Sequence, residues 1–114
     1  MKCIMMALIA FLALGATTIA YGGGLYGVIR NGDGNAVVGA SVQAFSDEGN
    51  SEIVTSGAGG YYCITTLWPG RTYKFVKAWK DDPIYQHGYN YDDFTFVYGY
   101  SYERNVTIQP PIEK

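Results

Sequence analysis

Tyrosine side chains supply the first candidate chemistry in this sequence. The chain has 11 tyrosines among 114 residues, and more than half of them lie in the segment 85–102. A tyrosine combines a flat apolar ring with a polar hydroxyl, so it can stack on a sugar ring or anchor a protein partner. Loops on a rigid scaffold commonly carry such sites. The sequence therefore predicts a ligand-binding patch whose members are Tyr85, His87, Tyr89, Tyr91, Tyr98, Tyr100 and Tyr102.

Aromatic residues also alternate along the end of this segment. They occupy every second position from Phe94 to Tyr102. Alternate side chains of a β-strand share one face of the sheet. Because large aromatic side chains are mostly buried, Phe94 and Phe96 are expected in the core. Gly99 and Ser101 favour a turn, which would place the neighbouring tyrosines near the rim of the fold.

Catalytic constellations are scarce, because the chain has 1 histidine, His87. A zinc hydrolase site typically needs more than one histidine, and any Ser-His-Asp or Cys-His arrangement would depend on His87 alone. The acidic pairs at 81–82 and 92–93 lack the spacing of a calcium-binding loop, so we interpret them as solvated loop ends. We expect no enzyme activity, no catalytic residue, no metal and no cofactor.

The N-terminus resembles a secretory leader. Lys2 precedes an apolar run over residues 4–15, and small residues follow at 18–20. This run is shorter than the roughly 20 residues that span a membrane, so residues 1–20 are predicted to be a cleaved signal peptide. The alternative is an uncleaved membrane anchor. Cleavage would remove Cys3 and leave Cys63 alone, with no intrachain disulfide. The expected location is secreted, either extracellular or in the cell envelope.

The charge pattern excludes one class of partner. The formal net charge is −2 at pH 7, and no basic cluster is present. A nucleic-acid-binding face needs concentrated positive charge, so no nucleic-acid partner is expected. No cationic amphipathic stretch indicates a membrane-surface helix, so no membrane contact is expected after cleavage.

The pattern of the rest of the chain predicts an all-β domain. Short β-prone runs are separated by turn residues such as Asn-Gly, Asp-Gly and Pro-Gly, which is typical of a sandwich or barrel. The segment 81–93 is expected to be a long loop. The alternation within 71–80 breaks after Phe75, which indicates a bulge or a sheet edge. The predicted strands cover residues 25–30, 39–45, 52–56, 61–66, 71–80, 94–98 and 105–109.

Two stretches resemble the carboxypeptidase regulatory-like domain family. Residues 27–42 match its opening pattern, Gly-x-Val, an Asp-Gly turn, then Gly-Ala-x-Val, with Ile29 at the first Val position. Residues 55–73 match its Gly-x-Tyr-x-Leu-x-x-Leu-x-Pro-Gly pattern followed by Tyr, with Ile64 at one of the Leu positions. The chain departs from the family at Ala36 and Val38, where proline is common, and at 57 and 59, where glycine replaces aspartate.

The resemblance implies a seven-stranded Greek-key β-sandwich of the prealbumin or transthyretin type, with a carbohydrate-binding-like fold. It covers residues 25–110, between a flexible lead-in at 21–24 and a tail at 111–114. The side chains expected to face inward are Ile29, Val42, Tyr62, Ile64, Leu67, Tyr73, Phe75, Val106 and Ile108.

The favoured function is an exported, non-catalytic binding or structural module. The expected partner is a polysaccharide or a surface protein, bound through the tyrosine-rich segment. Two alternatives remain open at this point: a ligand-free self-associating or spacer domain, and a small-molecule carrier.

Overall fold

The computed structural model describes residues 23–111, which form an all-β fold with a single 3₁₀ turn, η2 (Ala58–Gly60), and no α-helix. Within this range no helix is long and apolar enough to cross a membrane. The predicted signal peptide at 1–20 lies outside the described residues. The strands are β1 (Gly24–Asn31), β2 (Ser41–Phe45), β3 (Val54–Thr55), β4 (Tyr61–Ile64), β5 (Thr72–Tyr73), β6 (Phe75–Lys80), β7 (Gln86–Asn90), β8 (Phe94–Thr95), β9 (Ser101–Glu103) and β10 (Val106–Ile108).

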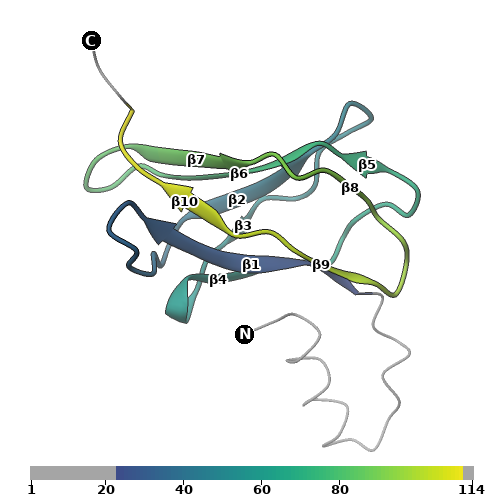
Figure 1. Ribbon diagram of the computed structural model, residues 1–114, viewed down its shortest axis with the longest axis horizontal. Helices are drawn as coiled ribbons and strands as arrows, with labels where there is room; N and C mark the ends of the chain where they lie inside the picture. The colour runs from purple at the N-terminus through teal and green to yellow at the C-terminus, as the bar shows by residue number, and fades with distance from the viewer. Residues whose placement is uncertain (1–22, 112–114) are drawn as a thin grey trace, which may run out of the picture.

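The first sheet is built around β1 (Figure 1). One edge of β1 pairs with antiparallel β4, and the other edge pairs in parallel with β9 and then with β10. The register of β1 against β9 continues unchanged into β10, so the two segments follow one line with an interruption at residues 104–105. At this interruption the side-chain oxygen of Asn105 accepts a hydrogen bond from the Val28 N–H at 2.9 Å.

The second sheet is antiparallel, in the order β3-β2-β6-β7. Its inner face is apolar because Val42 and Ala44 of β2 and Val76 and Ala78 of β6 are fully buried. Their neighbours in sequence are half-buried and belong to the opposite face, as the two-residue period of a strand requires. A further two-stranded sheet joins β5 and β8.

The two larger sheets enclose one hydrophobic core, which gives the molecule its sandwich character (Figure 1). Of the side chains predicted to face inward, all but Phe75 are buried, and so are Phe94 and Phe96. Phe75 is half-buried and lies on the outer face of the second sheet. The alternation changes phase at Lys74, whose N–H donates to the Phe45 carbonyl oxygen at 2.8 Å between β5 and β6. The break in alternation therefore lies where the chain passes from β5 into β6, one residue before the predicted position, and it turns Phe75 outward.

The expectation of a long loop at 81–93 is wrong, because this segment contains strand β7. The inward-facing positions of β7 are Gln86, Gly88 and Asn90, so the strand has no apolar periodicity for sequence reasoning to detect. Gly88 lies so close to β10 that an added Cβ would meet the Thr107 carbonyl oxygen at 1.8 Å. The backbone of His87 also pairs with that of Gln109 through hydrogen bonds of 3.0 and 3.1 Å. A strand made of polar residues and glycine thus joins the two sheets.

The described part of the chain has ten strands, whereas the sequence analysis expected seven. The run 71–80 divides into β5 and β6, β7 is added, and β9 is separate from β8. In the full-length chain, Cys63 of β4 is disulfide-bonded.

The close approach at Gly88 generates a stability prediction. Replacing Gly88→Ala should lower the free energy of unfolding by about 2–3 kcal/mol, because the new methyl group must push β7 away from β10. Gly57→Ala is the matched control, since nothing lies within 4 Å of its Cβ position and its φ is −109°. Urea unfolding of both variants measures the difference. Equal stabilities for the two variants would contradict the packing described for β7.

Tyr62 generates a second prediction, on alkaline stability. Its ring is buried, and its hydroxyl donates to the Arg104 carbonyl oxygen at 2.5 Å. Burial raises the pKa of Tyr62 far above its ordinary value, although the positive charge of Arg104 opposes the shift. The stabilisation from a neutral Tyr62 is therefore complete below the unfolded pKa of about 10 and is lost as the pH rises further.

Unfolding free energies measured between pH 8 and pH 11.5 should fall more steeply for the parent protein than for Tyr62→Phe. The expected difference in slope approaches about 1.4 kcal/mol per pH unit above pH 10. Tyr100→Phe is the control, because it removes the hydroxyl of an exposed tyrosine instead of a buried one. Parallel slopes for all three proteins would rule out a neutral, buried Tyr62.

Candidate functional site

The outer face of the second sheet gathers aromatic side chains from three strands. Register pairs Phe45 of β2 with Phe75 of β6, and Trp79 of β6 with His87 of β7. Tyr89 of β7 lies opposite Lys77 of β6. Cross-strand neighbours on one face stand about 4.5–5.5 Å apart at Cβ, so these rings are forced into contact.

Six aromatic rings of this face form a continuous series, which we call the aromatic ladder. Adjacent ring centroids lie 5.3 Å apart for Tyr85–His87, 5.7 Å for His87–Tyr89, 5.4 Å for Tyr89–Tyr91, 5.6 Å for Tyr91–Phe75 and 4.8 Å for Phe75–Phe45. The pairs Tyr89–Tyr91 and Phe45–Phe75 are nearly parallel, with interplanar angles of 15° and 11°. The members of the ladder are Tyr85, His87, Tyr89, Tyr91, Phe75 and Phe45.

The tyrosines of the ladder remain accessible to solvent. Tyr85 and Tyr89 are 40% and 39% exposed, and Tyr91 is 70% exposed. Offset stacking at these distances covers part of each ring and leaves the rest, with the hydroxyl, open. The ladder is thus an ordered apolar surface with hydroxyl groups along it.

A lysine lies beside the centre of the ladder. The Lys77 ammonium is 5.3 Å from the centroid of Trp79 and 5.8 Å from that of Tyr89. These distances fit a cation–π contact, which holds the lysine over the sheet face. It supplies hydrogen-bond donors next to the rings.

His87 takes part in the aromatic ladder through stacking and edge contacts of its imidazole ring. It stacks on Tyr85 at an interplanar angle of 26° and meets the edge of Tyr89 at 82°. In residues 23–111, Nδ1 of His87 is the buried side-chain polar atom without a hydrogen-bond partner. A catalytic histidine normally has this nitrogen held by a third group. The observed contacts of His87 are those of an aromatic packing residue.

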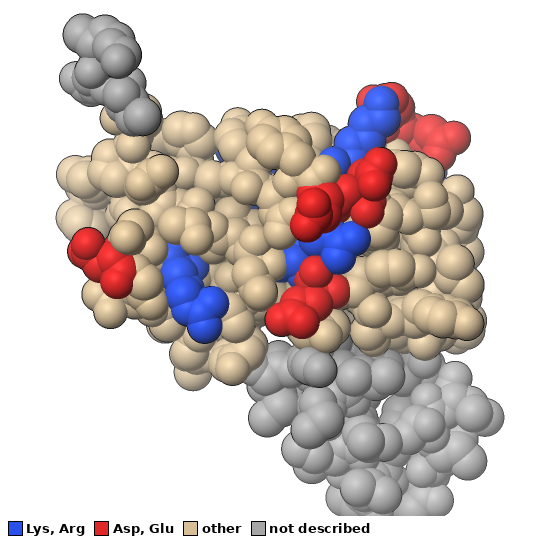
Figure 2. Space-filling view, in the orientation of Figure 1, with Lys and Arg blue, Asp and Glu red and all other residues tan. Residues whose placement is uncertain are grey.

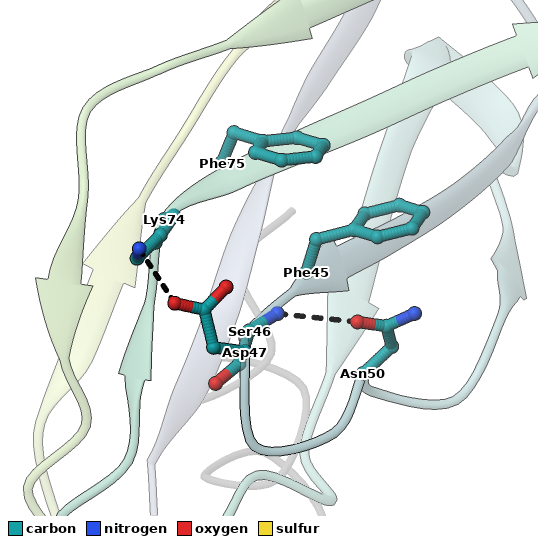
Figure 3. Close-up of a pocket in the computed structure, with 6 residues that line it drawn as sticks. All are labelled: Phe45, Ser46, Asp47, Asn50, Lys74 and Phe75. Carbon is teal, nitrogen blue, oxygen red and sulfur yellow. Dashed lines mark hydrogen bonds and ion pairs between the residues drawn. The ribbon is translucent and has the colours of Figure 1, made fainter.

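A small pocket adjoins the ladder at the end formed by Phe45 and Phe75 (Figure 3). Its volume is about 130 Å³. Lys74 pairs with Asp47 at 2.6 Å, and both side chains are mostly exposed. The hydrogen bond and charge of Asp47 raise the pKa of Lys74, so this lysine is cationic at neutral pH. The remaining lining residues are Ser46 and Asn50.

The remaining predicted site residues lie elsewhere. Tyr98 and Tyr100 are 62% and 64% exposed on a turn in which the Tyr100 N–H donates to the Val97 carbonyl oxygen at 3.0 Å. This turn lies near the opposite end of the long axis from the β6–β7 connection (Figure 1). No ring contact in the described residues joins either tyrosine to the ladder. The expectation of one continuous tyrosine patch is therefore corrected to two separate groups.

Tyr102 belongs to the packing of the fold. Its ring stacks on Phe94 at 4.7 Å and approaches Phe96 at 5.9 Å. Its hydroxyl donates to the Thr95 carbonyl oxygen and accepts from the Val97 N–H, both at 3.1 Å. These contacts hold β9 against the segment that follows β8. Tyr102 therefore contributes order to this end of the molecule, away from the ladder.

Sequence reasoning missed four residues of the outer face, namely Phe45, Phe75, Lys77 and Trp79. The signal was present in β6, where the positions outside the buried Val76 and Ala78 carry large side chains. It was obscured by the change of phase at Lys74, which made Phe75 appear to continue the buried side of Tyr73. Phe45 carried no signal of its own beyond its strand parity.

The face of the described residues that Figure 2 shows has no concentrated cationic patch. On the face shown in Figure 2, acidic and basic side chains lie side by side, mostly in one band, and much of the remaining surface is uncharged. Within residues 23–111, no group of three or more His, Cys, Asp or Glu side chains is arranged to hold a metal ion.

Comparisons with known proteins add little. No family model matches the chain, and no curated protein matches it. Among solved structures, the chain is similar to the crystal structure of the C-terminal domain of the PapC usher, with 21% sequence identity and a TM-score of 0.38. That match covers 76% of this chain and 99% of the other. A TM-score this low bears on neither fold nor function.

Proposed function

We propose that this protein is an exported, non-catalytic module that binds a polysaccharide along the aromatic ladder. The observation that carries the proposal is the row of six rings on one sheet face, of which Tyr85, Tyr89 and Tyr91 remain exposed. An exposed cluster of aromatic rings is uncommon on a protein that acts alone, and it usually marks an interaction surface.

The chemistry of the ladder suits a sugar chain. The C–H faces of a pyranose ring are apolar and pack on aromatic surfaces, while its hydroxyls pair with tyrosine hydroxyls and lysine ammonium groups. The ladder offers both kinds of group in one row, with Lys77 beside Tyr89. Because regular strand pairing fixes the backbone of Phe75, His87 and Tyr89 in β6 and β7, little backbone entropy remains to be lost there on binding.

The shape of the ladder also favours an extended ligand. The rings follow β7 from the β6–β7 turn and then cross β6 to β2. A chain of sugar residues can cover such a row of rings along its whole length. A second copy of the chain would have to cover the same face, and light scattering distinguishes this self-association from polysaccharide binding.

The proposal includes the family and the location predicted from the sequence. In it, residues 1–20 direct export, and the domain is a Greek-key sandwich of the carboxypeptidase regulatory-like type. The motif glycine Gly27 supports this, because its Cβ would meet the Arg104 carbonyl oxygen at 2.1 Å. The motif residue Tyr62 is buried opposite Gly27 in β4. Both motif positions therefore have a packing reason for their residue type.

Co-sedimentation with a panel of insoluble polysaccharides tests the proposal. The purified protein should be retained by at least one of them. The double variant Tyr89→Ala/Tyr91→Ala should bind about tenfold more weakly or worse, because two stacking contacts are removed. The matched control is Tyr98→Ala/Tyr100→Ala, which removes two exposed tyrosines at the other end of the molecule and should bind like the parent protein.

Two outcomes would overturn the proposal. Retention by none of the polysaccharides, together with a mass that rises with concentration in light scattering, would identify the ladder as a surface for self-association. Equal losses in both double variants would show that the ladder is not the binding surface. Circular dichroism of each variant checks that the sandwich is intact.

A further inference from the structure

The pocket in Figure 3 is continuous with the aromatic ladder. Phe45 and Phe75 line the pocket and are also the last two rings of the ladder. Phe75 contacts Tyr91 at 5.6 Å and Tyr89 at 5.7 Å between ring centroids. A polysaccharide chain that lies on the tyrosines therefore reaches the pocket at one end of its path.

The size of the pocket limits what it can receive. Its volume is about 130 Å³, whereas sites for whole small molecules usually measure roughly 300–1,000 Å³. The pocket therefore suits a substituent that projects from a larger ligand.

The lining of the pocket combines three kinds of surface. Phe45 and Phe75 provide an apolar side, with their rings stacked at 4.8 Å. One carboxylate oxygen of Asp47, Oδ2, is held by Lys74 at 2.6 Å, and the other points toward the side on which the phenyl rings lie (Figure 3). This second oxygen is an acceptor that the ion pair does not use.

Asn50 supplies the complementary donor. Its Oδ1 accepts a hydrogen bond from the Ser46 N–H at 3.2 Å. This contact fixes the side chain and leaves the Nδ2 amino group, which carries two N–H donors, directed away from Ser46 (Figure 3). The pocket thus presents an apolar wall, an acceptor and a donor within one small volume.

We propose that this pocket binds the acetamido group of an N-acetylated sugar, so that the polysaccharide on the ladder is one built from N-acetylated amino sugars. The inference rests on the proposed function. The acetamido N–H donates to the free carboxylate oxygen of Asp47, the acetamido carbonyl oxygen accepts from Nδ2 of Asn50, and the methyl group packs against the rings of Phe45 and Phe75.

Other common sugar substituents match the lining less well. A hydroxyl group leaves the phenyl rings without an apolar contact. A protonated amine or a carboxylate meets one like and one opposite charge of the Asp47–Lys74 pair, so the pair favours neither, and both groups leave the phenyl rings without an apolar contact. The acetamido group is neutral and carries a donor, an acceptor and a methyl group together, which is the combination that the pocket presents.

Calorimetric titration of the purified protein with chitin hexasaccharide and with cellohexaose tests this inference. These probes share the β-1,4-linked backbone and differ in the acetamido group. The parent protein should bind the chitin oligosaccharide at least about tenfold more tightly, which corresponds to the loss of one or two good hydrogen bonds. Asp47→Ala and Asn50→Ala should each reduce this preference to roughly threefold or less.

Glu48→Ala is the matched control, because Glu48 is an exposed acidic residue of the same loop and does not line the pocket. It should keep the full preference for the chitin oligosaccharide. Equal affinity of the parent protein for both oligosaccharides would overturn the acetamido inference and leave the polysaccharide function standing. Binding to neither of them, nor to any polysaccharide of the panel, would overturn both. If both Asp47→Ala and Asn50→Ala kept the full preference for the chitin oligosaccharide, the pocket would not be the acetamido-binding site.

Discussion

At Gly88 the backbone of β7 lies against the Thr107 carbonyl oxygen of β10, with no room for a side chain between them. Together with the strand pairing to β6, this close approach positions β7 against the first sheet, because the inward positions of β7 offer no large apolar side chain to bury. Once β7 is seated there, the two-residue period directs His87 and Tyr89 to the outer face. The row of rings on that face therefore depends on a contact between backbones on the opposite side of the same strand.

The outer rings stabilise one another as well as the sheet. Each stacked or edge-on pair contributes about 0.5–1.5 kcal/mol beyond the area that it buries, so the ladder stays ordered when nothing covers it. An exposed apolar face of this kind also promotes association with other molecules. Tyrosine hydroxyls and the ammonium group of Lys77 make the surface polar enough to favour ligands that pair stacking with hydrogen bonds.

The all-β fold and most of the core were predictable from the sequence, since residues such as Ile29, Val42 and Ile64 follow the strand period and are buried. The position of β7 was not, because its inner side is made of Gln86, Gly88 and Asn90 and gives no hydrophobic pattern. The candidate site was predictable in part: the tyrosines were found, but proximity in the chain was mistaken for proximity in space. Between Tyr91 and Tyr98 the chain passes through β8 and crosses to the other end of the molecule.

The polar pocket at one end of the aromatic ladder makes the two ends of the ladder different. A row of similar rings alone would let a sugar chain slide, because each ring offers the same apolar face to every sugar residue. The Asp47–Lys74 pair and Asn50 occur at one end only, beside Phe45 and Phe75. Polar groups with fixed donors and acceptors define register in a way that stacking does not. In the proposed polysaccharide complex, the rings would supply most of the contact area, and the loop between β2 and β3 would determine which sugar unit lies at the end of the row.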